Sequence, residues 1–272
     1  MPNFNDLNLS DWKNSGIWTD SLWIIPERDK TGKHSGFYHG NFVPQIPRQM
    51  ILRYSRKNDI VFDPFVGSGT SAFEAETLGR NFIGVDIQPK IIDYVKSKVD
   101  NKNYFSELIV GDSSSEKTLN QIVNFLEKKQ RNGVQLAILH PPYADIVKFS
   151  EYEEDLSNCK DLKDFLSKFS QVAKNTVKIL DKNRYLAVVI GDKYTKGQWI
   201  PLGFYCMNEI QKLGLTLKSV IIKNMEGNRA KQNKEAIWKY RALSSDYYIF
   251  KHEYILIFKN EKQSIQGRVN AA

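Results

Sequence analysis

The stretch "DIVFDPFVGSGTSAFEAETLGRNFIGVD" (residues 59–86) contains the clearest indication of the fold class. It opens on a short apolar run typical of a buried strand, and a glycine-rich turn follows directly. Residues 71–79 then carry a helical pattern, and residues 81–86 form a second β-branched run. A strand, a tight turn, a helix and another strand in this order predict a βαβ unit with parallel strands.

The same alternation continues along the chain. Expected strands occupy residues 59–63, 81–86, 107–112, 135–140 and 184–192. Helical patterns occupy residues 71–79, 89–102, 117–130 and 161–180. Two further β-like runs, 217–224 and 253–259, are separated by a polar, basic stretch and indicate an antiparallel end to the sheet. We therefore predict an α/β fold with a doubly wound, mainly parallel seven-stranded sheet and an antiparallel last strand.

The composition is that of a globular protein with a substantial core. The chain has 272 residues, of which 41% are hydrophobic and 26% charged. It has no apolar run long enough for a membrane span, and its first residues lack the pattern of a signal peptide. Cys159 and Cys206 are far apart, with no CxxC or Cys/His cluster. We therefore expect no metal site, no membrane association and a cytoplasmic location.

The net charge of +8 is unevenly distributed, and most of the excess falls after residue 190. Lys and Arg side chains that neutralise phosphates supply most non-specific affinity for nucleic acids. The charge therefore indicates a polyanion-binding C-terminal part, with a solvated basic face as the alternative.

The glycine turn has the spacing of a nucleotide-binding loop. Gly67, Gly69 and Ala72 satisfy G-x-G-x-x-A between a strand and a helix, and Asp86 ends the second strand. Small residues allow a tight turn and close backbone approach to a ligand, and the distant carboxylate can bind ribose hydroxyls. This arrangement predicts a ligand that contains adenosine.

Acidic residues at the strand ends narrow the choice of ligand. Asp63 directly precedes the loop, where it would repel a pyrophosphate and attract an ammonium group. Asp112 follows the third strand, where it could accept a hydrogen bond from an adenine amino group. Each Asp alone could be a helix N-cap. The three together favour S-adenosylmethionine, which carries an ammonium and a sulfonium, over NAD.

A second unusual turn, "LAILHPPY" (residues 136–143), ends the fourth expected strand. Two prolines cannot continue a central strand, but they hold a stiff loop. The turn presents His140 and Tyr143 at the same edge of the sheet as the glycine turn, because ligands bind beyond the carboxyl ends of parallel strands.

These motifs together resemble those of the amino-group DNA methyltransferases. Residues 63–87 are similar to the cofactor motif of that family, and "HPPY" is similar to its (D/N/S)-P-P-(Y/F/W) catalytic motif. "FVPQIPRQMILRYS" (residues 42–55) resembles the segment that covers the methionine end of the cofactor. The resemblance implies a class I, Rossmann-like methyltransferase fold and S-adenosylmethionine as cofactor.

The resemblance also implies the site residues. Those expected to bind the cofactor are Phe42, Pro44, Asp63, Pro64, Phe65, Gly67, Gly69, Thr70, Asp86, Ile87, Asp112 and Ser113. Those expected at the catalytic turn are His140, Pro141, Pro142 and Tyr143.

The implied reaction explains the composition of the catalytic turn. An exocyclic amine on a base is a poor nucleophile because its lone pair is delocalised into the ring. The enzyme must therefore flip the base out, hold it by stacking and accept hydrogen bonds from the amino group, which draws that group towards tetrahedral geometry. Tyr143 would stack on the flipped base, while the Pro141 carbonyl and the His140 side chain would accept hydrogen bonds from its amino group. The family more often has Asp, Asn or Ser at position 140, so the choice between N4-cytosine and N6-adenine stays open. An imidazole accepts a hydrogen bond only when neutral, so we expect activity to fall below about pH 6.5.

Residues 224–248 combine basic and aromatic side chains, which suits phosphate contact with stacking. The residues expected to bind nucleic acid are Lys193, Arg229, Lys231, Lys234, Trp238, Lys239 and Arg241. Residues 191–203 could line the base pocket or form a plain loop. Residues 149–158 could form a lid or an acidic solvated loop.

The sequence therefore predicts a site-specific DNA methyltransferase acting on double-stranded DNA, with a cognate restriction enzyme as a candidate partner. The alternatives are an RNA base methyltransferase, a protein or small-molecule N-methyltransferase, and a non-catalytic nucleic-acid-binding protein. The oligomeric state stays open. Expected regions are an irregular aromatic-rich segment (1–40), the methyltransferase domain (41–262) with a recognition insertion at about 224–250, and a tail (263–272).

Overall fold

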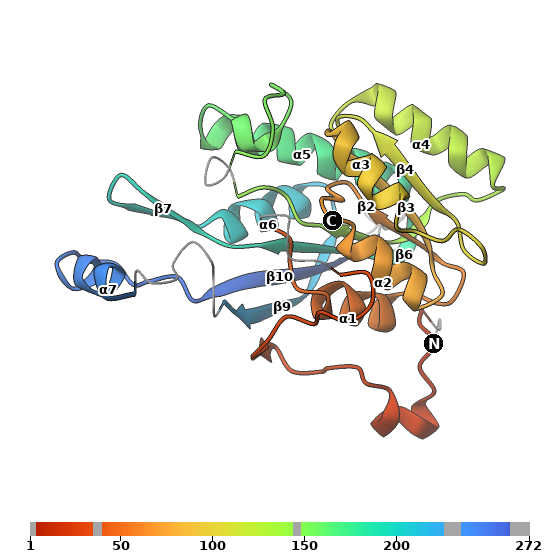
Figure 1. Ribbon diagram of the computed structural model, residues 1–272, viewed down its shortest axis with the longest axis horizontal. Helices are drawn as coiled ribbons and strands as arrows, with labels where there is room; N and C mark the ends of the chain where they lie inside the picture. The colour runs from red at the N-terminus through yellow and green to blue at the C-terminus, as the bar shows by residue number, and fades with distance from the viewer. Residues whose placement is uncertain (1–3, 35–39, 144–147, 226–234, 262–272) are drawn as a thin grey trace, which may run out of the picture.

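The computed structural model describes residues 4–34, 40–143, 148–225 and 235–261, and they form a sheet with helices on both faces (Figure 1). The strands of the main sheet are β1 (Leu22–Trp23), β2 (Ile60–Asp63), β3 (Asn81–Asp86), β4 (Ser106–Val110), β5 (Val134–Leu139), β6 (Leu180–Ile190), β9 (Thr216–Asn224) and β10 (His252–Lys259). Their order is β1-β9-β10-β6-β5-β2-β3-β4. β10 is antiparallel to β6 and β9, and the other neighbouring pairs are parallel. The predicted fold class is confirmed.

Helices cover both faces of the sheet. They are α1 (Gln45–Tyr54), α2 (Thr70–Thr77), α3 (Pro89–Lys96), α4 (Glu116–Lys128), α5 (Leu162–Ile179), α6 (Leu202–Lys212) and α7 (Glu235–Leu243), with 3₁₀ turns at Leu9–Asn14 and Leu156–Asn158. α1, α2 and α3 pack in one apolar cluster and α4, α5 and α6 in the other. Figure 1 shows α1 and α2 on the side opposite α4 and α5.

Strand β2 shows why the strand sequences are continuous apolar runs. Ile60 and Phe62 are buried with α4 and α5, whereas Val61 is buried with α1, α2 and α3. Successive side chains of a strand point to opposite faces, so a strand covered on both faces needs apolar residues at every position. The same burial on both faces holds for β3 and β5.

The sheet has one more strand than the sequence predicts. Leu22 and Trp23 pair in parallel with Ile222 and Lys223 at the edge of the sheet, inside a segment expected to be irregular. Two residues are too short to give an alternating pattern, and their pairing depends on a strand about 200 residues away. The main-chain N–H of Ile25 continues the contact by donating to Asn224 Oδ1 at 2.7 Å.

Ion pairs fasten the N-terminal segment to α1 and α2. Arg48 bridges Asp29 and Glu74, with Nη2 2.7 Å from Asp29 Oδ2 and 2.8 Å from Glu74 Oε1. His34 Nε2 lies 2.7 Å from the same Glu74 oxygen, and the Glu74 side chain is 1% exposed. These contacts place the segment next to the glycine turn.

Three helices were not predicted. α1 contains Pro47, which is acceptable because it lies in the first turn. α6 follows the hairpin of β7 (Lys193–Thr195) and β8 (Gln198–Ile200). This hairpin lies within residues 191–203, for which a stretch lining the pocket and a plain loop were both open. α7 lies within the basic stretch that was expected to be non-helical, so that expectation is wrong. Within the described ranges, every helix is too short or too polar to cross a membrane.

Candidate active site

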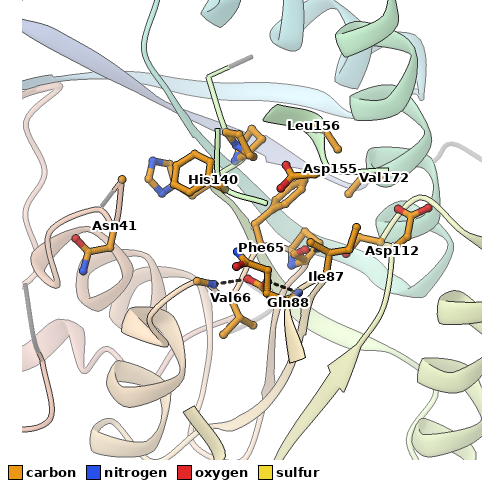
Figure 2. Close-up of a pocket in the computed structure, with 18 of the residues that line it drawn as sticks. Asn41, Phe65, Val66, Ile87, Gln88, Asp112, His140, Asp155, Leu156 and Val172 are labelled. Carbon is orange, nitrogen blue, oxygen red and sulfur yellow. Dashed lines mark hydrogen bonds between the residues drawn. The ribbon is translucent and has the colours of Figure 1, made fainter. Parts of the chain in front are cut away.

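One cavity joins the glycine turn to the catalytic turn. Its walls come from the ends of β2, β3, β4 and β5, together with residues 40–42 and 149–156. In Figure 2, Phe65, Val66, Ile87 and Gln88 lie together below His140, and Asp112 and Val172 lie at the far end from Asn41. The carboxyl ends of four parallel strands therefore meet at this site, as the topology requires.

The glycine turn is held by left-handed backbone and by Asp86. Gly67 and Gly69 have φ values of 50° and 83°. A Cβ at Gly69 would lie 2.8 Å from Val95 Cγ1 and 3.0 Å from Phe73 Cζ, so a side chain there would need both conformational strain and displacement. The main-chain N–H of Gly67 donates to Asp86 Oδ2 at 3.0 Å, which ties the turn to the end of β3.

Asp86 lies at the cavity, but its carboxylate also has a structural task. Its Oδ1 accepts from the main-chain N–H of Gln88 at 2.9 Å. Burial raises the pKa of Asp86 to about 6, against the lowering effect of these hydrogen bonds. Each carboxylate oxygen has a second lone pair, so Asp86 can still accept a ligand hydroxyl.

Asp63 lies behind the turn and does not line the cavity. It is fully buried, with Oδ1 accepting from the main-chain N–H of Phe65 at 2.8 Å and Oδ2 from Ser71 Oγ at 2.6 Å. Burial raises the pKa of Asp63 to about 7. Its carboxylate thus closes the loop onto the start of α2, and direct contact with a cofactor stays a prediction.

Most of the other predicted cofactor residues line the cavity. These are Phe42, Pro64, Phe65, Gly67, Thr70, Ile87, Asp112 and Ser113. Pro44 and Gly69 do not line it. Asp112 Oδ1 accepts from the main-chain N–H and the hydroxyl of Ser114, both at 2.8 Å, and so also caps the turn before α4.

The sequence missed part of the cavity wall. Asn41 lines it and donates to Ser68 Oγ at 3.0 Å, and Gln88 follows Asp86 by two residues. Asp155 and Leu156 also line it, within the segment left open as a lid or a loop. The nearness of Gln88 to Asp86 was the available signal, whereas nothing local indicates that Asp155 turns towards the cavity.

His140 lies at the cavity as a neutral imidazole. Its ring meets Phe42 edge-on, with centroids 4.7 Å apart, and Nε2 lies 3.2 Å from the Tyr143 hydroxyl. Burial lowers the pKa of His140 to about 4, although the Glu253 carboxylate opposes this shift. The expected loss of activity near pH 6.5 therefore does not follow from this residue, because the structure keeps it uncharged well below that pH.

Tyr143 lies outside the cavity lining and takes part in a buried polar chain. Its hydroxyl donates to Glu253 Oε2 at 2.8 Å, and Lys223 Nζ donates to Glu253 Oε1 at 2.9 Å. Burial raises the pKa of Tyr143 well above its ordinary value, and Glu253 raises it further. Lys223 and Glu253 were not predicted, because residues on two separate strands give no shared local pattern.

The predicted nucleic-acid residues divide between two elements. Lys193 lies on β7 and Trp238, Lys239 and Arg241 lie on α7, with the Arg241 guanidinium 5.5 Å from the Trp238 ring centre. Figure 1 shows β7 and α7 projecting from the same end of the molecule. Arg229, Lys231 and Lys234 lie outside the described residues.

The segment after α7 packs on the β7–β8 hairpin through two ring contacts. Tyr194 stacks on Tyr247 with centroids 4.3 Å apart, and the Trp199 and Phe250 ring centroids are 4.1 Å apart. We refer to the hairpin, α7 and the segment after α7 together as the basic and aromatic arm. No cluster of His, Cys, Asp and Glu side chains suited to a metal ion occurs in the part of the chain that the structure describes.

Three comparisons place the chain among known proteins. The sequence profile of the DNA methylase family matches residues 4–97 and 134–270. The Type II methyltransferase M.HinfI of Haemophilus influenzae is 37% identical over 86 residues, covering 30% of this chain and 23% of its own. The Type II methyltransferase M2.LlaDCHI of Lactococcus lactis subsp. cremoris is 34% identical over 101 residues, covering 37% of this chain and 34% of its own.

Those matched stretches cover about a third or less of the curated relatives. Among solved structures, TrmN from Thermus thermophilus matches with a TM-score of 0.51 at 14% identity, covering 82% of this chain and 50% of that one. That likeness supports the fold alone, whereas the family profile covers most of the chain. The chain therefore belongs to the DNA methylase family, and S-adenosylmethionine is its cofactor.

Proposed function

We propose that this protein transfers a methyl group from S-adenosylmethionine to the exocyclic amino group of a flipped cytosine or adenine in double-stranded DNA. The observation that supports this most is the shared cavity. It is lined by Gly67, Asp86 and Asp112, and also by His140 and Pro141 of the catalytic turn. A donor site and an acceptor site in one cavity suit a direct transfer, in which catalysis is chiefly positioning.

The charge of the cavity fits this cofactor. Asp86, Asp112, Glu154 and Asp155 line it, and none of the described lining residues is Lys or Arg. A pyrophosphate would meet carboxylates without a compensating cation, whereas a sulfonium and an ammonium would be attracted. Asp86 would accept from the ribose hydroxyls and Asp112 from the adenine amino group. The bound cofactor supplies an electrophilic methyl group.

The catalytic turn supplies acceptors for the amino group. A neutral imidazole accepts one N–H through its unprotonated nitrogen, and the Pro141 carbonyl is the second candidate acceptor. Drawing the amino hydrogens away localises the nitrogen lone pair, which the ring otherwise delocalises. Tyr143 is the candidate stacking surface for the flipped base. Both target bases carry such an amine, so N4-cytosine and N6-adenine remain equal candidates.

The projecting arm is the candidate DNA-binding surface. Lys193 on β7 and Lys239 and Arg241 on α7 would neutralise phosphates, and exposed aromatic side chains such as Tyr240 and Tyr248 suit stacking or insertion. M.HinfI and M2.LlaDCHI are both named as Type II methyltransferases. We therefore propose that this protein has a partner restriction enzyme that recognises the same DNA sequence, and that it acts in the cytoplasm.

Expression in a host that lacks DNA methylation tests this proposal directly. Modification-sensitive sequencing should reveal N4-methylcytosine or N6-methyladenine within one short sequence, and the genomic DNA should resist cleavage by an enzyme for that sequence. His140→Ala, produced at the same level, is the matched control and should leave the DNA unmodified. If DNA from the host that expresses the wild-type protein is unmodified, and the protein methylates structured RNA in vitro, the choice of DNA as substrate is wrong.

A further inference from the structure

We propose that Glu253, paired with Lys223, is a positioning residue that acts through Tyr143 to fix the tautomer of His140 and leave its Nδ1 as the acceptor. This inference rests on the proposed function for its purpose, since the acceptor would serve the target amine. The position of the single imidazole proton of His140 can be measured without any substrate.

The pair is built into the sheet. Lys223 on β9 and Glu253 on β10 stand directly opposite each other in the antiparallel register, and their side chains are 9% and 8% exposed. A buried carboxylate and ammonium must be paired and hydrogen-bonded to avoid a large desolvation cost. Lys223 Nζ satisfies Glu253 Oε1 at 2.9 Å, which leaves Oε2 to accept from another donor.

The hydroxyl of Tyr143 is that donor. It lies 2.8 Å from Glu253 Oε2, and an ionised carboxylate can only accept. A phenol has a single O–H, so this bond uses the one proton that Tyr143 can donate. The phenolic oxygen can therefore only accept from His140 Nε2, which lies 3.2 Å away.

The proton on the imidazole follows from this chain of donors. A neutral imidazole carries one N–H, and the contact with Tyr143 assigns it to Nε2. The lone pair is then on Nδ1, and the described residues offer this atom no hydrogen bond. His140 lines the cavity (Figure 2). We therefore take Nδ1, which has no hydrogen-bond partner among the described residues, as the acceptor for the amino group of a base.

Nitrogen-15 NMR of the ligand-free full chain tests the assignment. The chain has 4 His residues, and the spectrum of His140→Asn identifies the signals of His140. In the wild-type protein, Nε2 should be protonated and Nδ1 unprotonated. Glu253→Gln should give a mixture of tautomers, because an amide can donate to the phenol as well as accept from it. Protonated Nδ1 in the wild-type protein, or an unchanged tautomer in Glu253→Gln, would overturn the proposal.

Kinetics separate positioning from a merely structural role. Glu253→Gln should lower the single-turnover rate in proportion to the fraction of His140 that keeps the Nε2–H tautomer, roughly 2-fold for equal populations, while the affinity for S-adenosylmethionine and DNA stays unchanged. An asparagine at position 140 has no tautomers. Glu253→Gln should therefore have no further effect in the His140→Asn background, whereas an equal loss there would show that Glu253 only holds β9 and β10 together.

The variant could lose stability because it leaves Lys223 buried without a charge partner. The double variant Lys223→Met/Glu253→Leu removes both charges, which is often nearly neutral for stability. It should also give mixed tautomers of His140, and a retained Nε2–H tautomer in this folded protein would overturn the proposal. A wild-type protein that transfers no methyl group to DNA would refute the proposed function and leave the NMR test intact.

Discussion

Replacing Asp63 with Asn should reduce the loss of stability that the protein shows as the pH rises from about 5 to about 7. The carboxylate is fully buried, and its two oxygens accept from the Phe65 N–H and from Ser71 Oγ. An asparagine of the same shape can accept from Phe65 N–H through its oxygen and donate to the serine through its amide. The substitution therefore keeps the loop closed and removes the titrating group.

The magnitude follows from the raised pKa. The pKa of Asp63 is about 7 in the folded protein against the ordinary value of 3.8, because burial disfavours the charged form. The folded state thus holds a proton that the unfolded state has lost, so stability falls as the pH rises through this window. Between pH 5 and pH 7 the wild-type protein should lose about 2 kcal/mol that Asp63→Asn does not lose.

Urea unfolding at pH 5, 6, 7 and 8 measures this difference. Groups distant from Asp63 titrate alike in both proteins, so the gap between the two free energies of unfolding reports on Asp63, with a smaller part from Asp86, whose charge raises the pKa of Asp63. Asp100→Asn, at a side chain 52% exposed, is the matched control and should show no such trend. A gap that does not change with pH would refute the reasoning. Calorimetry adds a second readout. A direct contact of Asp63 with the ammonium group of S-adenosylmethionine would weaken cofactor binding in Asp63→Asn, whereas a carboxylate that only closes the loop behind the cavity would leave the affinity within about 2-fold of the wild type.

Four further outcomes are expected. Asp86→Ala should weaken S-adenosylmethionine binding by roughly 10-fold or more in calorimetry, because the carboxylate both lines the cavity and holds Gly67; unchanged affinity would contradict its role. Single-turnover rates should show no titration near pH 6.5, since the pKa of His140 is lowered to about 4, and a midpoint there that His140→Asn abolishes would be contrary evidence. Lys239→Ala/Arg241→Ala should reduce the salt slope of DNA binding by about 2 at unchanged cofactor affinity, and an unaltered slope would remove α7 from the phosphate contacts. Tyr143→Ala should impair base binding and turnover, whereas His140→Ala should impair mainly turnover; equal effects on binding would refute these separate roles.

The sequence predicted those parts of the fold that are encoded locally. The glycine turn and the strands on either side of it form a contiguous pattern, and each predicted strand lies within a few residues of an observed one. β1 depends instead on pairing with Ile222 and Lys223, which no local pattern announces. α7 was hidden because its interior, "AIWKYRA", mixes apolar and basic residues without a clear buried face.

The site was predictable to the same extent. A carboxylate at a strand end points either to the cavity or back into the structure, and the sequence is alike in both cases. Asp86 and Asp112 line the cavity, whereas Asp63 faces Ser71. The pair of Lys223 and Glu253 depends on the register of two strands, so it becomes visible only when that register is known.

The histidine in the catalytic turn connects these observations. Asp, Asn and Ser, the residues that the resemblance leads one to expect, accept through oxygen in every protonation and tautomeric state available near neutral pH. An imidazole accepts through one nitrogen and donates through the other, so a histidine in this place needs control of both its charge and its tautomer. Burial beside Phe42 supplies the first by lowering the pKa, and the Tyr143 hydroxyl supplies the second. A turn with His140 therefore requires the Lys223–Glu253 pair on strands β9 and β10 to orient the Tyr143 hydroxyl, whereas a turn with an oxygen acceptor would not require it.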